Sequence, residues 1–188
     1  NVAGMRGSGS HDVAVDDLFV PERFTTKTYY ERTRETGPLF RFPSFSRLAY
    51  NKVGVATGIA RAAIDDFIAL ASQKTPRASP KLLAERPYAQ VAVADAETRL
   101  RSARAFVFET VDEVWQTTLA GDEATKKQRA LIQLACSQAV AASARVVEIV
   151  YAAAGTAPNF VSSPLERRMR DVHVVGQHIM VSPGLVEP

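Results

Sequence analysis

The chain has 188 residues, of which 46% are hydrophobic and 23% are charged, with a formal net charge of +3. Its one cysteine, Cys136, excludes an internal disulfide scaffold and a zinc site built from cysteines, and it fits a reducing compartment. The small charge excess does not favour nucleic acid, and no run approaches the roughly 18 apolar residues that span a membrane. We therefore expect a cytoplasmic protein that binds neither nucleic acid nor a membrane.

The first residues predict a strand rather than a helix. Residues 13–20, VAVDDLFV, mix β-branched and apolar residues with acids, and Pro21 ends the run. The chain begins with Asn1 rather than methionine, so we expect a fragment of a longer protein, with the partner strand upstream. Residues 22–45 contain several breakers, which predicts an irregular connector.

Long alanine-rich segments with helical periodicity follow. The first predicted helix runs over about 46–74 and is stopped by a Thr-Pro pair. The second starts at about residue 83 or 87 and ends near 120, where Gly121 is a C-terminal stop and Asp122 a candidate N-cap for the next helix. The third, about 123–154, is apolar on much of its circumference, as in a bundle core or a subunit interface.

The last predicted helix has the clearest start signal. Ser163, Pro164 and Glu166 match an N-cap, a first-turn proline and a capping box, and the helix is expected to continue to about His178. On such a helix Arg167, Asp171 and His178 fall on one face. These residues form either a chemical site or an ordinary i,i+4 salt bridge with a histidine that caps the helix or meets solvent.

The predicted fold is mainly α: an up-and-down four-helix bundle preceded by a remnant strand of a β-domain. The sequence contains no Walker phosphate loop, no H-E-x-x-H zinc signature and no G-x-S-x-G nucleophile elbow. We therefore predict no metal site. The glycine-rich residues 4–10, GMRGSGS, precede a strand and so lack the context of a dinucleotide fingerprint.

Motifs at both ends resemble the acyl-CoA dehydrogenase superfamily. Residues 4–10 with 15–21, VDDLFVP, look like the end of its middle β-domain, and residues 164–171, PLERRMRD, resemble the start of its last helix. The resemblance covers essentially the whole chain. It implies the end of a middle β-domain over 1–24, a connector over 25–45 and a C-terminal helical bundle domain over 46–188.

Departures from the dehydrogenase pattern point to one branch. Many acyl-CoA dehydrogenases carry a catalytic glutamate eight residues after the aspartate that matches Asp171, and here that position is Ile179. The preceding His178 resembles the flavin-dependent monooxygenases of the superfamily, among them oxygenase components of two-component phenol and steroid-ring hydroxylases and dibenzothiophene monooxygenases. The resemblance implies that His178 is catalytic.

The same resemblance implies a reduced flavin, FMN or FAD. Its expected contacts are Ser8 and Ser10 in the glycine-rich segment, together with Gly155 and Thr156 before the last helix. Arg77 is a candidate for the flavin phosphate, against the alternative of a solvated loop arginine. The superfamily's Gly-Gly-x-Gly loop is poorer in glycine here, which suits reduced flavin supplied by a reductase.

The implied reaction is hydroxylation of a small aromatic substrate through a flavin C4a-hydroperoxide. An NAD(P)H-flavin reductase is the implied partner, and the bundle is expected to assemble into a homo-oligomer, a tetramer in much of the superfamily. Two alternatives remain: an acyl-CoA dehydrogenase-like oxidoreductase with a displaced base, and a non-catalytic helical assembly module.

Overall fold

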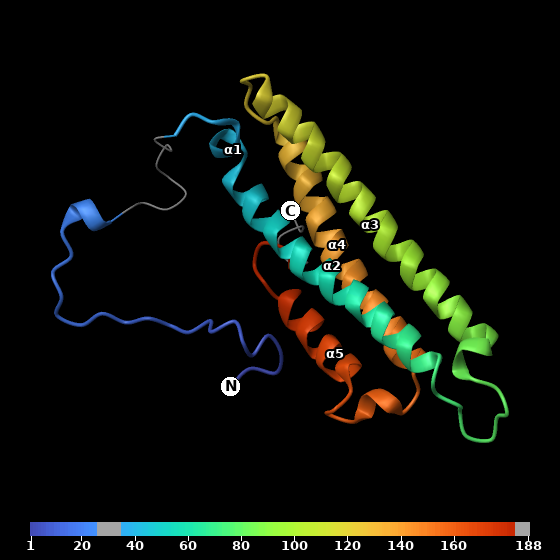
Figure 1. Ribbon diagram of the computed structural model, residues 1–188. Helices are drawn as coiled ribbons and strands as arrows, with labels where there is room; N and C mark the ends of the chain where they lie inside the picture. Colours follow the sequence, from blue (N-terminus) through green and yellow to red (C-terminus); the bar gives the residue numbers. More distant parts are fainter. Residues whose placement is uncertain (26–34, 183–188) are drawn as a thin grey trace.

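Four helices pack side by side in the predicted chain order (Figure 1). The structure is a computed structural model that describes residues 1–25 and 35–182. The helices are α2 (Ser44–Ala71), α3 (Pro87–Leu119), α4 (Lys126–Ala153) and the shorter α5 (Pro164–Val175). The predicted up-and-down bundle is confirmed. The chain positions 26–34 of the predicted connector and 183–188 of the predicted bundle domain lie outside the described residues.

Short helices occupy parts of the predicted connector and loops. A 3₁₀ turn, η1, spans Glu22–Phe24, and α1 spans Pro38–Arg41, so the connector is not wholly irregular. Two further 3₁₀ turns, η2 (Leu83–Glu85) and η3 (Ala157–Asn159), precede α3 and α5. The helices α1, α3 and α5 each begin with a proline. Proline suits the first position of a helix, because the N–H that it lacks would have no partner within the helix.

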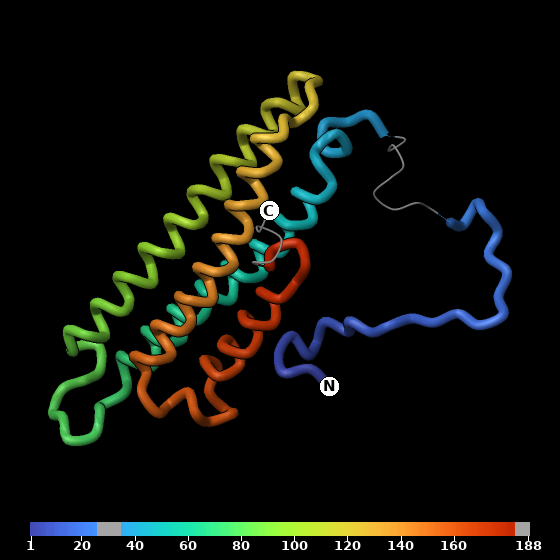
Figure 2. The backbone as a smooth tube through the Cα atoms, turned by 180° about the vertical axis from the view of Figure 1, so that it is seen from behind, coloured from blue at the N-terminus to red at the C-terminus, as the bar shows by residue number. Residues whose placement is uncertain are grey.

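The predicted strand over residues 13–20 is wrong for this chain. These residues form no strand, and all of them are exposed. In Figure 2 they belong to an extended arm that leaves the bundle beyond the N-terminal turn. A strand requires a hydrogen-bonding partner, and the described residues contain no second strand to supply one.

Two of the predicted helix caps also differ from the structure. Thr125, not Asp122, caps α4, because its hydroxyl accepts from the amide of Gln128 while the Gln128 side chain accepts from the Thr125 amide. Ser163 does occupy the N-cap position of α5, but its side chain makes no capping hydrogen bond. Glu166 instead pairs with Arg170 one turn later, so no capping box forms.

Helix α4 is the centre of the bundle. It packs against α2, α3 and α5, which explains the broad apolar surface noted in the sequence. By length and composition alone α4 is long and apolar enough to cross a membrane, but half of its apolar stretch is buried inside this protein. Packing inside a bundle accounts for the same composition.

The core is made largely of alanine and valine, with a few larger side chains among them. Phe67 and Ile64 from α2 are fully buried, as are Ile132 and Cys136 from α4. Burial raises the pKa of the Cys136 thiol to about 12, so this cysteine is a packing residue and not a nucleophile. Every fully buried side-chain polar atom in the described residues has a hydrogen-bond partner.

Candidate functional site

The site is organised by the turn that follows α5. The helix ends at Val175 with Gly176 as its C-cap, so His178 stands three residues beyond the helix. Val181 and Ser182 donate their amides to the His178 carbonyl, at 2.9 and 3.0 Å. The Gln133 side chain of α4 donates to the Met180 carbonyl at 2.7 Å. The turn is therefore built from its own hydrogen bonds and tied to the central helix.

The imidazole of His178 is exposed, with one nitrogen engaged. The Met180 amide lies 3.2 Å from Nδ1 and donates to it. Because Nδ1 accepts this bond, a neutral His178 carries its proton on Nε2. Partial burial lowers the pKa of His178 from its ordinary value, and the positive charge of Lys52 lowers it further. A neutral ring with an Nε2–H donor is thus the favoured form near neutral pH.

The prediction that His178 shares a helix face with Arg167 and Asp171 is wrong. The helix stops before residue 178, so the periodicity that placed the imidazole above Asp171 does not apply. Asp171 also makes a contact outside its helix, because its carboxylate accepts from the Met5 amide at 2.6 Å. The alternative of a simple i,i+4 salt bridge is replaced by this long-range contact, and the salt bridge of α5 joins Glu166 to Arg170.

The glycine-rich residues 4–10 form a turn against α5. Gly4 is buried there, and Met5 has a positive φ of 52°. Past this contact the turn is open to solvent. The hydroxyls of Ser8 and Ser10 lie 3.4 Å apart and both residues are exposed, so hydrogen-bonding capacity remains for a ligand.

Between this turn and α5 lies an open basic groove of about 490 Å³. Arg168 in its wall is paired with Asp66 of α2, at 3.1 Å, and Arg170 with Glu166. The groove is lined by Met5, Arg6, Gly7, Ser8, Arg167, Arg168, Arg170 and Asp171.

The other predicted flavin contacts lie in the loops at one end of the bundle. Arg77 is exposed in the loop between α2 and α3, and Gly155 and Thr156 are exposed in the loop between α4 and α5. Lys74 links the two loops, because its Nζ donates to the Ala154 carbonyl at 2.7 Å. Gly155 has a φ of +66°, which favours glycine at this turn.

The structure therefore separates the predicted cofactor residues into two groups (Figures 1 and 2). Ser8 and Ser10 belong to the turn beside α5. Arg77, Gly155 and Thr156 belong to the end loops. Among residues 1–25 and 35–182, no group of three or more His, Cys, Asp or Glu side chains forms a metal site.

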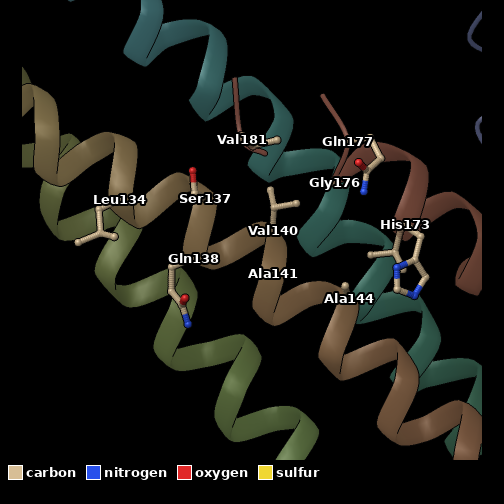
Figure 3. Close-up of a pocket in the computed structure, with 11 residues that line it drawn as sticks. Leu134, Ser137, Gln138, Val140, Ala141, Ala144, His173, Gly176, Gln177 and Val181 are labelled. Atoms are coloured by element: carbon tan, nitrogen blue, oxygen red, sulfur yellow. The ribbon is translucent and has the colours of Figure 1, made fainter. Parts of the chain in front are cut away.

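A second hollow, of about 340 Å³, lies between α4 and the end of α5 (Figure 3). Leu134, Val140 and Ala141 contribute apolar surface from α4, while His173 and Gln177 border it from the α5 side. His178 does not line it. Gly176, Gln177 and Val181 of the turn that carries His178 do line it, so the groove adjoins the predicted chemical site and offers an apolar face on the surface of the bundle.

Two residues near His178 were missed in the sequence. Lys52 is the one charged residue between Arg47 and Arg61 on α2, and that isolation within an apolar stretch was an available signal. Gln133 holds the turn after α5, but its contact to Met180 spans 47 positions and left no local signal.

Comparison of the sequence with known proteins places most of the chain in one protein family. Residues 51–183 match the family described as "Acyl-CoA dehydrogenase, C-terminal domain". An indole-3-acetate monooxygenase of Pseudomonas putida is 37% identical over 178 residues, which are 95% of this chain and 46% of that protein. A protein of the same name from Acinetobacter baumannii is 30% identical over 187 residues, 100% of this chain and 48% of that protein. The chain spans about half the length of the curated relatives it matches.

The fold also matches a solved structure over nearly its whole length. XiaF from Streptomyces, in complex with FADH2 and glycerol, superposes with a TM-score of 0.89 at 22% identity. The match covers 99% of this chain and 49% of that one. At this identity the likeness establishes the fold.

Proposed function

The chain belongs to the acyl-CoA dehydrogenase family through its C-terminal domain, and from this premise we propose that it forms part of the oxygenase component of a two-component flavin-dependent monooxygenase. The substrate is a small aromatic molecule, and the protein acts in the cytoplasm. In this proposal residues 1–24 end a middle β-domain, 25–45 connect, and 46–188 form the bundle domain.

One observation carries the proposal: an imidazole, and not a carboxylate, stands in the turn after α5. Residue 179, where the dehydrogenase pattern has its glutamate, is isoleucine with 71% of its surface exposed. A hydrocarbon side chain cannot remove a proton from a thioester. The neighbouring His178 has a neutral ring near neutral pH and an Nε2–H available to a ligand. The indole-3-acetate monooxygenase of Pseudomonas putida, which is 37% identical over 95% of this chain, supports the same assignment.

The residues of the turn beside α5 fit a reduced flavin. When bound, the flavin supplies the electrons that activate oxygen. Ser8 and Ser10 have exposed hydroxyls for the polar edge of the ring system, and His178 lies in the turn that follows the same helix. Arg77, Gly155 and Thr156 would meet the phosphate end of a flavin across a subunit boundary, because the two groups of residues lie apart in one chain.

His178 acts as a hydrogen-bond donor in this proposal. The Met180 amide occupies Nδ1, which leaves Nε2–H free to donate to the reacting oxygen atom. A neutral ring with that proton already in place is suited to donating to oxygen and not to removing a proton from a phenol.

Lys52 favours a substrate that carries an acidic group. It is partly buried on α2, and its charge acts on His178. A carboxylate attached to the aromatic ring would offset that charge beside the imidazole. The names of the two indole-3-acetate monooxygenases fit an aromatic acid of this kind. We therefore propose an arylacetate as the substrate class.

Replacing Lys52 with methionine should move the acid limb of the pH profile to higher pH. The depressed pKa of His178 keeps the ring neutral as the pH falls, and removing the lysine charge raises that pKa toward its ordinary value. Protonation occurs at Nδ1 and removes the bond from the Met180 amide that orients the ring, so the active neutral form is then lost at a higher pH. The measurement is product formation against pH in the active protein.

The same variant tests the acid group of the substrate. The KM for indole-3-acetate should rise on the order of tenfold, the effect of a charge pair worth about 1.4 kcal/mol, whereas the KM for indole should not change. An unmoved acid limb, or equal effects on the two substrates, would contradict the role of Lys52.

Two partners complete the proposal. Reduced flavin is the form bound in the XiaF complex, and a separate NAD(P)H-flavin reductase is the natural source of it for an oxygenase. Either FMN or FAD meets the requirement. The second partner is another copy of the chain, since the apolar surface of α4 continues to exposed residues such as Leu134. We propose a homo-tetramer that assembles through the bundle.

Leu134→Glu should reduce the size of the oligomer. Leu134 is 44% exposed on α4 and borders the apolar groove of Figure 3. A carboxylate buried in an interface there would carry a desolvation penalty of several kcal/mol. Light scattering after gel filtration should show a smaller species at micromolar concentration. Lys127→Glu, on the exposed first turn of α4, is the matched control and should leave the size unchanged.

The function is tested by asking what oxidises and what reduces the flavin. The active protein should consume oxygen and convert the aromatic acid only when a reductase, NAD(P)H and flavin are supplied. Anaerobic reduction of its flavin by an acyl-CoA would identify the dehydrogenase-like alternative and overturn the proposal. Failure to bind any flavin would identify a non-catalytic assembly module.

A further inference from the structure

The N-terminal turn is held to α5 by two separate hydrogen bonds. The Met5 amide donates to the Asp171 carboxylate at 2.6 Å. The Arg170 guanidinium donates to the Ala3 carbonyl through Nη1 and holds Glu166 through its other nitrogens. The two bonds to Met5 and Ala3 join residues more than 160 positions apart in the sequence. A contact of this range fixes two distant segments to each other.

Gly4 makes the close approach possible. It is buried, and a Cβ atom placed on it would lie less than 3.0 Å from the Arg170 carbonyl and from the Asp171 amide nitrogen. All of those atoms belong to the backbone of α5, so they cannot move aside as a flexible side chain would. Only glycine allows the turn to lie at this distance from the helix.

The turn accepts backbone strain to make this contact. Met5 has a φ of 52°, in the left-handed region that side chains other than glycine rarely adopt. Such a conformation persists where surrounding contacts compensate for it. The charge-assisted bond from the Met5 amide to Asp171 is one such contact.

The position of these contacts relates them to the site. Asp171 lies one helical turn before the end of α5, and His178 lies three residues past that end. On the other side, Ser8 follows Met5 by three residues and donates its amide to the Met5 carbonyl at 3.0 Å. The contacts therefore join the segment that carries the exposed serines to the helix that leads to the imidazole.

We propose that Gly4, Arg170 and Asp171 form a clasp that sets the position of the glycine-rich turn relative to His178, so that Asp171 and Arg170 are positioning residues for the reaction. The inference rests on the proposed function for what the turn and the imidazole do. The clasp itself rests only on the contacts of this chain. If it loosens, a ligand held by Ser8 and Ser10 shifts with respect to the imidazole, and oxygen is released as peroxide instead of being transferred.

Hydrogen exchange tests the clasp without any ligand. The Met5 amide should exchange at least about tenfold faster in Gly4→Ala and in Asp171→Ala than in the unaltered chain, because each change removes the bonded geometry. Gly7→Ala is the matched control, since a Cβ there meets nothing within 4 Å and its exchange should not change. Asp171→Asn retains an acceptor oxygen and should restore part of the protection. A Met5 amide that exchanges in the unaltered chain as fast as the exposed residues 12–20 would overturn the clasp.

The positioning role is tested in the active protein by the ratio of product formed to flavin oxidised. Gly4→Ala should lower this ratio several-fold while flavin oxidation continues at its former rate. The ratio in Asp171→Asn should lie between that of Asp171→Ala and that of the unaltered protein. Gly4→Ala leaves every side chain of the bundle in place, so it remains informative if Asp171→Ala fails to fold. Faster exchange with an unchanged ratio would overturn the positioning role. Normal protection at Met5 together with no product from the unaltered protein would instead reject the proposed function and leave the clasp standing.

Discussion

His178→Ala should lower the product formed per flavin oxidised by at least about a hundredfold, the typical loss when a single donor to a reacting oxygen is removed. The Nε2–H of this residue is free for a ligand because the Met180 amide occupies Nδ1. Without it, reduced flavin should still bind and react with oxygen. The electrons should then appear as hydrogen peroxide, so product and peroxide are measured together in the same reaction.

His173→Ala is the matched control for this prediction. His173 lies on α5 five residues earlier, half of its side chain is exposed, and its Nε2 is 3.5 Å from Glu148 of α4. It should leave the ratio of product to peroxide unchanged. His178→Gln retains an amide donor and should recover part of the product. A ratio in His178→Ala equal to that of the unaltered protein would remove His178 from the chemistry.

Phe67→Ala should destabilise the bundle by about 3–5 kcal/mol, the usual cost of truncating a buried phenylalanine. Phe67 has no exposed surface and lies in the core formed by α2, α3, α4 and α5. Its neighbours are largely alanine and valine, whose short side chains cannot extend to fill the space left behind. Urea unfolding should show a lower midpoint, and the thermal midpoint should fall by roughly 6–20 °C for a chain of this size.

The adjacent Ile68→Ala provides the comparison. Ile68 is 42% exposed on the same helix, so its truncation removes much less buried surface and should cost at most about 1 kcal/mol. Equal losses at positions 67 and 68 would mean that α2 does not present the face that the structure assigns to the core.

The helices were predictable because their signals are local. Apolar residues at three- and four-residue steps identified α2 and α3, a broadly apolar segment identified α4, and prolines marked the starts of α3 and α5. The errors lie where local signals compete. Asp122 and Thr125 are both good N-cap residues, and the reciprocal bond to Gln128 selects Thr125. Glu166 was equally suited to a capping box and to an i,i+4 pair, and it pairs with Arg170.

The sequence supplied candidate site residues, whose roles stay predictions, but it did not supply their geometry. The resemblance of the end motifs singled out His178, Ser8 and Ser10. The helix, however, ends at Val175, and the imidazole is set by a turn whose hydrogen bonds involve Met180 and the distant Gln133. The contact of Met5 with Asp171 likewise spans 166 positions. No periodicity or spacing encodes such contacts, because they arise only when the bundle has formed.

The proposed function requires that the active protein transfer one oxygen atom from O₂ to an aromatic acid. The direct measurement is mass spectrometry of the product formed from indole-3-acetate under ¹⁸O₂, with flavin kept reduced by NADH and a flavin reductase. We expect a hydroxylated product with one ¹⁸O atom per molecule. Oxidation of all the reduced flavin with reduction of O₂ to hydrogen peroxide and no labelled product, or a product oxygen that comes from water, would refute the proposed function.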